Sequence, residues 1–151
     1  TGGGADAAAG WPSGRIIDGR FVDDTFRMSI AVPSGWVVEL GSAEDALRIR
    51  LIDEVTGAVI ELWEFSAVLT EPVPRPGCAW AFQDRGPYRG VPTNSLIMVA
   101  TCTPDDPGAP RVFAWLVGSD QVTWQVELHT PAERLSEARQ AGEAILQTLR
   151  F

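Results

Sequence analysis

The strongest constraint on the fold of this chain is that a helical pattern is clear at only one place, its C-terminal end. There Thr130 is a favourable N-cap, Pro131 suits the first turn, and Glu133 completes a capping box. Apolar and small residues then recur at helical spacing, namely Leu135, Ala138, Gly142, Ile145, Leu146 and Leu149. Because Gly142 lies within this stripe, we expect the helix backbone to come close to the surface on which it packs.

Strand patterns dominate the chain before this helix. Residues 121–129 alternate strictly, with Trp124, Val126 and Leu128 on one face and polar residues on the other. Six further segments have strand character: 26–32, 47–52, 58–69, 78–82, 96–102 and 111–117. The fold class is therefore α+β. We expect an antiparallel sheet of six or seven strands with the C-terminal helix packed on one face.

The register of one hairpin can be predicted. Residues 54–57 form a four-residue loop with Gly57 in the left-handed conformation, which pairs Asp53 with Ala58. A slip by one residue would mix apolar and charged positions on each face, so this register is preferred. It predicts the pairs Leu51–Ile60 and Ile49–Leu62 on one face, and Ile52–Val59, Arg50–Glu61 and Arg48–Trp63 on the other.

Both faces of the predicted sheet need cover, because segments 58–69, 96–102 and 111–117 are apolar on both sides. One helix covers one face. The second face needs the N-terminal segments, the proline-rich loop 70–77 or another chain. We therefore hypothesise that a protein partner or a second copy of this chain binds there.

The charged residues exclude many functions. The chain has 20 acidic residues and 12 basic ones, all of them arginine, and a net charge of −8 that disfavours nucleic acid. Without lysine there is neither Schiff-base chemistry nor a P-loop, and the single histidine, His129, excludes zinc sites that need several imidazoles. We expect His129 to be solvated, and we predict no catalytic residue, no metal and no cofactor. No apolar run is long enough for a transmembrane segment.

The two cysteines, Cys78 and Cys102, are too far apart for a Cys-x-x-Cys motif. They are either two buried free thiols or a disulfide, and a disulfide would require an oxidising compartment. The sequence leaves both alternatives open.

Residues 1–14 are rich in glycine and alanine and are predicted to be a flexible tether, followed by a single domain over 15–151. Such a tether would suit a mature lipoprotein whose lipid anchor lies upstream of Thr1.

Residues 21–36 carry a family resemblance. An aromatic residue at Phe21, a short polar turn, the alternating strand and Pro33-Ser34-Gly35-Trp36 together resemble the opening of PsbP-like domains. The closing helix, which runs into residues 145–149, is similar to the end of that family. The resemblance implies an α/β/α-type sandwich and a non-enzymatic binding or assembly role outside the cytoplasm, as in photosystem subunits and many bacterial lipoproteins. A departure is the proline-rich stretch 70–77, where many members carry another helix.

The chain has six tryptophans, and two of them are candidate binding residues. Trp124 and Trp36 are expected in the core, whereas Trp63 and Trp80 are candidates for partly exposed aromatic residues. Arginines beside Tyr88 could hold an anion. The candidate set for a ligand or partner is Trp63, Phe65, Trp80, Arg85, Tyr88 and Arg89.

Together these patterns predict a non-enzymatic, extracytoplasmic module at the periplasm or cell surface, tethered and docked to a protein partner or envelope complex. The alternative is a secreted domain that binds carbohydrate or another small ligand through exposed tryptophan. A hydrolase or thiol enzyme built around His129 and a cysteine is the third and least favoured interpretation.

Overall fold

The computed structural model describes residues 15–23, 28–41, 46–65, 73, 78–85, 96–104, 106, 108–118 and 123–150. For some of these strand residues only the backbone is described. The predicted tether, residues 1–14, lies outside the described residues, as do Tyr88 and Arg89.

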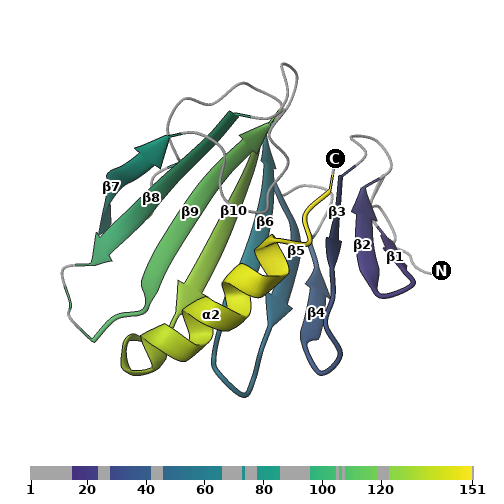
Figure 1. Ribbon diagram of the computed structural model, residues 1–151, viewed down its shortest axis with the longest axis horizontal. Helices are drawn as coiled ribbons and strands as arrows, with labels where there is room; N and C mark the ends of the chain where they lie inside the picture. The colour runs from purple at the N-terminus through teal and green to yellow at the C-terminus, as the bar shows by residue number, and fades with distance from the viewer. Residues whose placement is uncertain are drawn as a thin grey trace.

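The larger of two antiparallel sheets has seven strands in the order β4-β5-β6-β10-β9-β8-β7 (Figure 1). Its strands are β4 (Val37–Leu40), β5 (Leu47–Ile52), β6 (Val59–Phe65), β7 (Cys78–Arg85), β8 (Leu96–Pro104), β9 (Arg111–Gly118) and β10 (Thr123–Thr130). The helix α2 (Leu135–Leu146) packs across one face of this sheet, and η1 (Ala132–Arg134) is a short 3-10 turn before it. The predicted α+β class, an antiparallel sheet of six or seven strands with the C-terminal helix on one face, is confirmed. Segment 26–32, expected among these strands, instead belongs to a smaller sheet, and β4, which was not predicted, supplies the seventh strand.

The smaller sheet consists of β1 (Arg15–Ile17), β2 (Arg20–Asp23) and β3 (Met28–Ala31) in that order. The end of the chain attaches to it: Arg150 exchanges two backbone hydrogen bonds with Ser29, and the Arg20 guanidinium donates to the Thr148 carbonyl at 2.6 Å. The Thr148 hydroxyl in turn accepts from the backbone N–H of Ala31 at 2.9 Å. The segment that follows α2 therefore fixes the smaller sheet beside the larger one.

The register of the β5–β6 hairpin follows the prediction over most of its length. Gly57 has φ +80°, Asp53 N–H donates to Ala58 at 2.8 Å, and four of the predicted cross-strand pairs form. The pair Arg48–Trp63 was wrong, because a bulge between Leu47 and Ile49 places Leu47 opposite Trp63. The bulge lets Arg48 pair instead with Glu64 at 3.1 Å.

The predicted capping box at the start of the helix was also wrong. Thr130 is the last residue of β10, paired with Arg111, and its side chain is buried. The chain turns at Pro131 and passes through η1, so α2 starts only at Leu135, and its N-cap residue Arg134 makes no side-chain capping bond. The sheet continues one residue further than the sequence pattern indicated, and the strand pairing keeps Thr130 from capping.

The core lies between α2 and the larger sheet. Trp124, Val126 and Leu128 of β10 face the helix, as the alternation predicted, and are buried together with Ala138 and Ile145 of α2. Trp36, expected in the core, is partly buried and packs against it. The buried cluster comprises Phe21, Met28, Ile30, Ile49, Leu51, Ala58, Ile60, Leu62, Phe113, Trp115, Trp124, Val126, Leu128, Ala138, Ile145, Leu146 and Leu149.

Gly142 is where α2 approaches the sheet most closely. A Cβ atom on this residue would lie 2.3 Å from Leu128 Cδ1 and 2.9 Å from Cδ2, and Leu128 is fully buried. We expect Gly142→Val to lower the free energy of unfolding by about 2 kcal/mol or more through overpacking. Ala144→Val, on the exposed side of the same helix, is the control, because it changes helix propensity by only about 0.5 kcal/mol. Equal urea midpoints for the two variants would contradict this packing.

Candidate functional site

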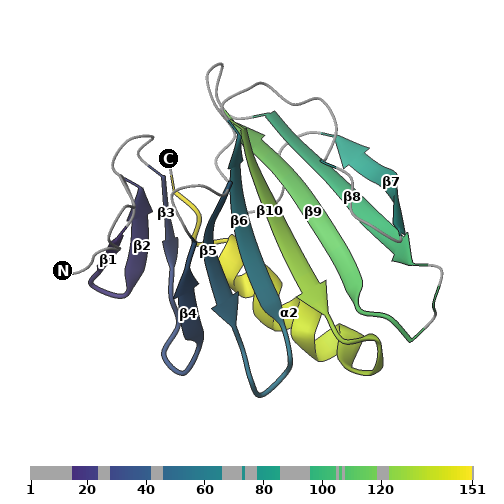
Figure 2. The same cartoon turned by 180° about the vertical axis from the view of Figure 1, so that it is seen from behind.

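The side of the larger sheet opposite α2, called the second face below, is seen in Figure 2. Strand alternation places every second residue of β6 and β10 on it. These residues are Val59, Glu61, Trp63 and Phe65 of β6, and Thr123, Gln125, Glu127 and His129 of β10. Although most of them are polar or charged, the β10 residues up to Glu127 are buried. Buried polar groups need partners, so the second face carries a network of polar contacts.

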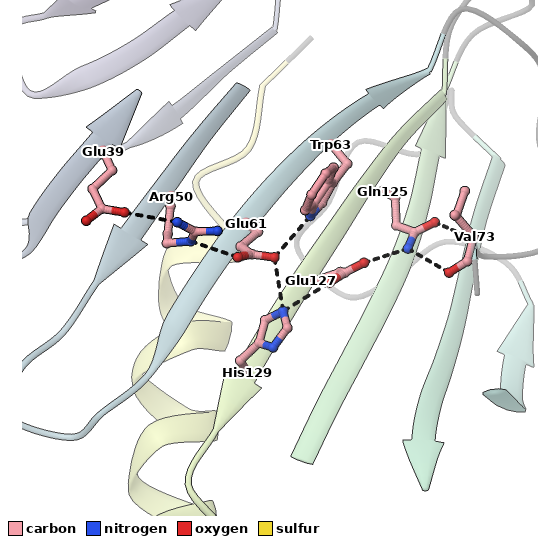
Figure 3. A network of polar contacts seen from close by, with 8 residues as sticks. All are labelled: Glu39, Arg50, Glu61, Trp63, Val73, Gln125, Glu127 and His129. Atoms are coloured by element: carbon pink, nitrogen blue, oxygen red, sulfur yellow. Dashed lines mark hydrogen bonds and ion pairs between the residues drawn. The ribbon is translucent and has the colours of Figure 1, made fainter. Parts of the chain in front are cut away.

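Two carboxylates meet at the centre of this network. The register of β6 and β10 sets Glu61 directly opposite Glu127, and both are buried, at 8% and 0% exposure. Like charges placed opposite each other in a sheet repel, so this pair needs cations beside it. His129 supplies the first cation: its Nε2 lies 3.0 Å from Glu127 Oε1 and 3.2 Å from Glu61 Oε1 (Figure 3).

The network extends from these carboxylates in two directions. Toward the sheet edge, Arg50 Nε donates to Glu61 Oε2 at 2.7 Å, and Arg50 Nη1 donates to Glu39 Oε1 at 3.0 Å. Trp63 Nε1 donates to Glu61 Oε1 at 3.1 Å. Toward β9, Gln125 Nε2 donates to Glu127 Oε2 at 2.6 Å. The four oxygens of the two carboxylates therefore all accept hydrogen bonds.

These contacts set the charge of the imidazole. Burial is the strongest single influence on His129 and disfavours the imidazolium, but the hydrogen bonds and charges of Glu127 and Glu61 together outweigh it. They raise the pKa of His129 from 6.5 to about 9. For Glu61, burial opposes the charged form, while the bonds to His129, Arg50 and Trp63 prevail and lower its pKa from 4.5 to about 2. The imidazole is therefore a cation at neutral pH.

The expectation of a solvated His129 was wrong. The side chain is only 28% exposed and bridges two carboxylates. The sequence carried part of the signal, since His129 follows Glu127 by two residues on the same strand face. The other part, the pairing of β6 with β10, joins residues that are 66 positions apart at Glu61 and Glu127. A hairpin argument cannot find such a pairing.

A residue of the proline-rich segment covers part of the second face. Val73 N–H donates to Gln125 Oε1 at 2.7 Å (Figure 3). The Val73 carbonyl accepts from Trp80 Nε1 at 2.9 Å. Of the three covers considered for this face, the proline-rich loop therefore contributes one, at Val73.

Three of the predicted binding residues share the second face. Trp63 and Phe65 follow Glu61 on β6, and both are partly exposed. The register from β7 to β10 places Trp80, also partly exposed, on the same side. Only the backbone of Arg85 is described, at the end of β7, and Tyr88 and Arg89 lie outside the described residues.

Among the described side chains, Glu61, Glu127 and His129 are a set that could hold a metal ion, with one donor atom from each lying within 4.8 Å of the others. None of the three was predicted to be a metal ligand, because none of the usual metal-binding spacings joins them.

The backbone register bears on the two cysteines, whose side chains are outside the described part. Cys78 lies opposite Pro104 and Cys102 opposite Trp80, so the cysteines are diagonal neighbours on adjacent strands. Diagonal positions are about 7–8 Å apart, more than most disulfides span. Of the two open alternatives we therefore expect free thiols. Thiol titration of unfolded, unreduced protein should count two, equal to the reduced control, and a count of zero would contradict this expectation.

Comparison with known proteins supports the fold. No family model matches the chain, and no curated protein matches it either. Among solved structures, the solution structure of cyanobacterial PsbP (CyanoP) from Synechocystis sp. PCC 6803 is similar over 97% of both chains, with a TM-score of 0.61 at 9% sequence identity. Within the described residues no helix is long and apolar enough to cross a membrane. The chain therefore has a PsbP-like fold, as the resemblance at residues 21–36 implied.

Proposed function

We propose that this chain is a non-catalytic binding module that acts outside the cytoplasm and docks to a protein partner through its second face. The observation that carries the proposal is that three partly exposed aromatic residues, Trp63, Phe65 and Trp80, lie on that one face. Aromatic residues with one polar edge are enriched at protein interfaces. The PsbP-like fold supports the proposal, because the resemblance implies an assembly role.

Hydrogen bonds to two of these aromatic residues give the surface a fixed shape. Trp63 is held by its indole N–H on Glu61, and Trp80 by its indole N–H on Val73. Rings that are already ordered lose little conformational entropy when a partner binds. A preorganised aromatic surface of this kind suits docking.

Site-specific photocrosslinking in intact cells tests the docking. A photoreactive phenylalanine analogue at Phe65 replaces one aromatic side chain with another, and the same analogue at Val55 is the control. Val55 is 74% exposed and lies in the β5–β6 turn, at the other end of β6 from Phe65. We expect one adduct of discrete mass from position 65 and none from position 55. Equal adducts, or none, would overturn the proposal.

Two further measurements separate the alternatives. An adduct of twice the chain mass, together with a dimer in light scattering, would identify the partner as a second copy. Tryptophan fluorescence tests the small-ligand alternative: a saturable shift with a glycan would favour it, because Trp63 and Trp80 lie on the binding face.

The extracytoplasmic, tethered location is part of the same proposal. Protease added to spheroplasts of cells that make the intact precursor should degrade the protein, and the membrane fraction should retain it. Protection from protease would contradict the location, and recovery in the released periplasmic fraction would contradict the tether.

A further inference from the structure

We propose that Glu61, Glu127 and His129 form a binding site for a divalent cation of the zinc class on the second face. The inference does not rest on the docking proposal, since its donor atoms belong to Glu61, Glu127 and His129 and not to the aromatic side chains. It rests on the convergence of three donor atoms, His129 Nε2 and the Oε1 atoms of Glu61 and Glu127.

The two carboxylates are already oriented for such a site. The far oxygen of Glu61 is held by Arg50 at 2.7 Å, and the far oxygen of Glu127 is held by Gln125 at 2.6 Å. These outer contacts leave each Oε1 directed at the imidazole, and Glu61 Oε1 also accepts a hydrogen bond from Trp63 Nε1 at 3.1 Å. Metal ligands in proteins are commonly oriented by hydrogen bonds of this kind. The ligand set therefore needs little reorganisation to accept an ion.

The spacing of the donors suits a small ion. Four-coordinate zinc has ligand bonds of about 2.0–2.2 Å, which place neighbouring ligand atoms about 3.3 Å apart. The imidazole nitrogen is already 3.0 and 3.2 Å from the two oxygens. One nitrogen with two carboxylates suits zinc and similar transition metals, whereas calcium and magnesium prefer all-oxygen sites.

The charged groups around the donor atoms also favour a cation. The carboxylates of Glu39, Glu61 and Glu127 outnumber the one guanidinium, that of Arg50. When the ion binds, the Nε2 lone pair coordinates it, and a proton carried by that nitrogen leaves to solvent. His129 is 28% exposed, which gives the ion a route of entry.

Isothermal titration of the chelator-stripped full chain with zinc chloride tests the site. We expect one ion bound per chain. Cobalt should bind with a visible spectrum typical of a nitrogen–oxygen site, and magnesium at equal concentration should bind far more weakly. Absence of saturable zinc binding, or equal affinity for magnesium, would overturn the proposal.

Conservative variants locate the ion. Glu127→Gln and Glu61→Gln keep the side-chain size and remove one ligand charge each, so each should weaken zinc binding at least tenfold. Glu137→Gln is the matched control, since Glu137 lies on α2, on the other side of the sheet, and pairs with Arg134, so the zinc affinity of this variant should match that of the wild type. Circular dichroism checks that each variant is folded. Zinc binding that survives both ligand variants unchanged would show an adventitious ion and contradict the site.

Discussion

His129→Ala is expected to lower the free energy of unfolding by about 3–5 kcal/mol in metal-free buffer at pH 6. The substitution removes the imidazolium that lies between Glu61 and Glu127, and Glu127 is fully buried. Removing one partner of a buried ion pair is costly, because the remaining charge loses its compensation in a poorly solvated place. Urea unfolding at constant ionic strength measures the loss.

A double-mutant cycle separates this effect from lost packing. Glu127→Gln keeps the bond geometry and removes one charge, so His129→Ala should cost less in that background than in the wild type. We expect a coupling of about 1–3 kcal/mol, the range found for residues in one hydrogen-bond network. A loss below 1 kcal/mol for His129→Ala, or a coupling near zero, would show that the imidazole is not part of a buried ion network.

The same network predicts a stability maximum between about pH 4.5 and 6.5. The pKa of His129 is raised to about 9, so its contribution is complete below 6.5 and is lost as the pH rises through 9. The pKa of Glu61 is lowered to about 2, so its contribution is complete above 4.5 and is lost as the pH falls toward 2. Each of the two pKa shifts corresponds to at most about 3 kcal/mol of stability. Because both shifts include the His129–Glu61 contact, the two contributions are not summed.

Chemical denaturation across the pH range, with chelator present, checks this profile. The groups that face the imidazole are Glu61 and Glu127, with Arg50 and Glu39 behind Glu61. In the His129→Ala variant the fall between pH 6.5 and 9 should flatten, which separates it from cysteine and tyrosine ionisation. A wild-type profile that rises over that interval would contradict the network.

Much of the fold could be predicted because its signals are local. Three features depend only on residues that are close together in the sequence: the alternation in β10, the apolar stripe of α2 and the loop at Gly57. The β5–β6 register followed from matching faces, and it failed only at Arg48, where a bulge intervenes. Bulges leave no clear pattern in a single strand, so this error has a physical cause.

The candidate site was harder to predict because it depends on distant pairing. Glu61 meets Glu127 only when β6 lies beside β10 in the sheet. Along the chain, three other strands, β7, β8 and β9, separate β6 from β10. Taken alone, Glu127 and His129 on a polar strand face indicate a solvated surface. The contacts of Val73 and Arg50 turn that surface into a partly covered one, which alternation within one strand cannot show.

The aromatic candidates were predicted in part. Trp63 was selected because it shares a strand face with Glu61, and Trp80 because it lies next to the loop that holds Tyr88. The structure places both on the second face with their indole N–H groups bonded. Arg85, Tyr88 and Arg89 remain candidates from the sequence, because their side chains lie outside the described part of the chain.

On the second face, two carboxylates share the charged, partly buried imidazole of His129. His129 is the only histidine in the chain, so its ring signals in a proton NMR spectrum need no assignment by mutagenesis. Titration of those signals in chelator-treated protein should give a pKa near 9, and Glu127→Gln should move it downward. A midpoint near 6.5, unchanged by Glu127→Gln, would show an ordinary solvated histidine and contradict the account.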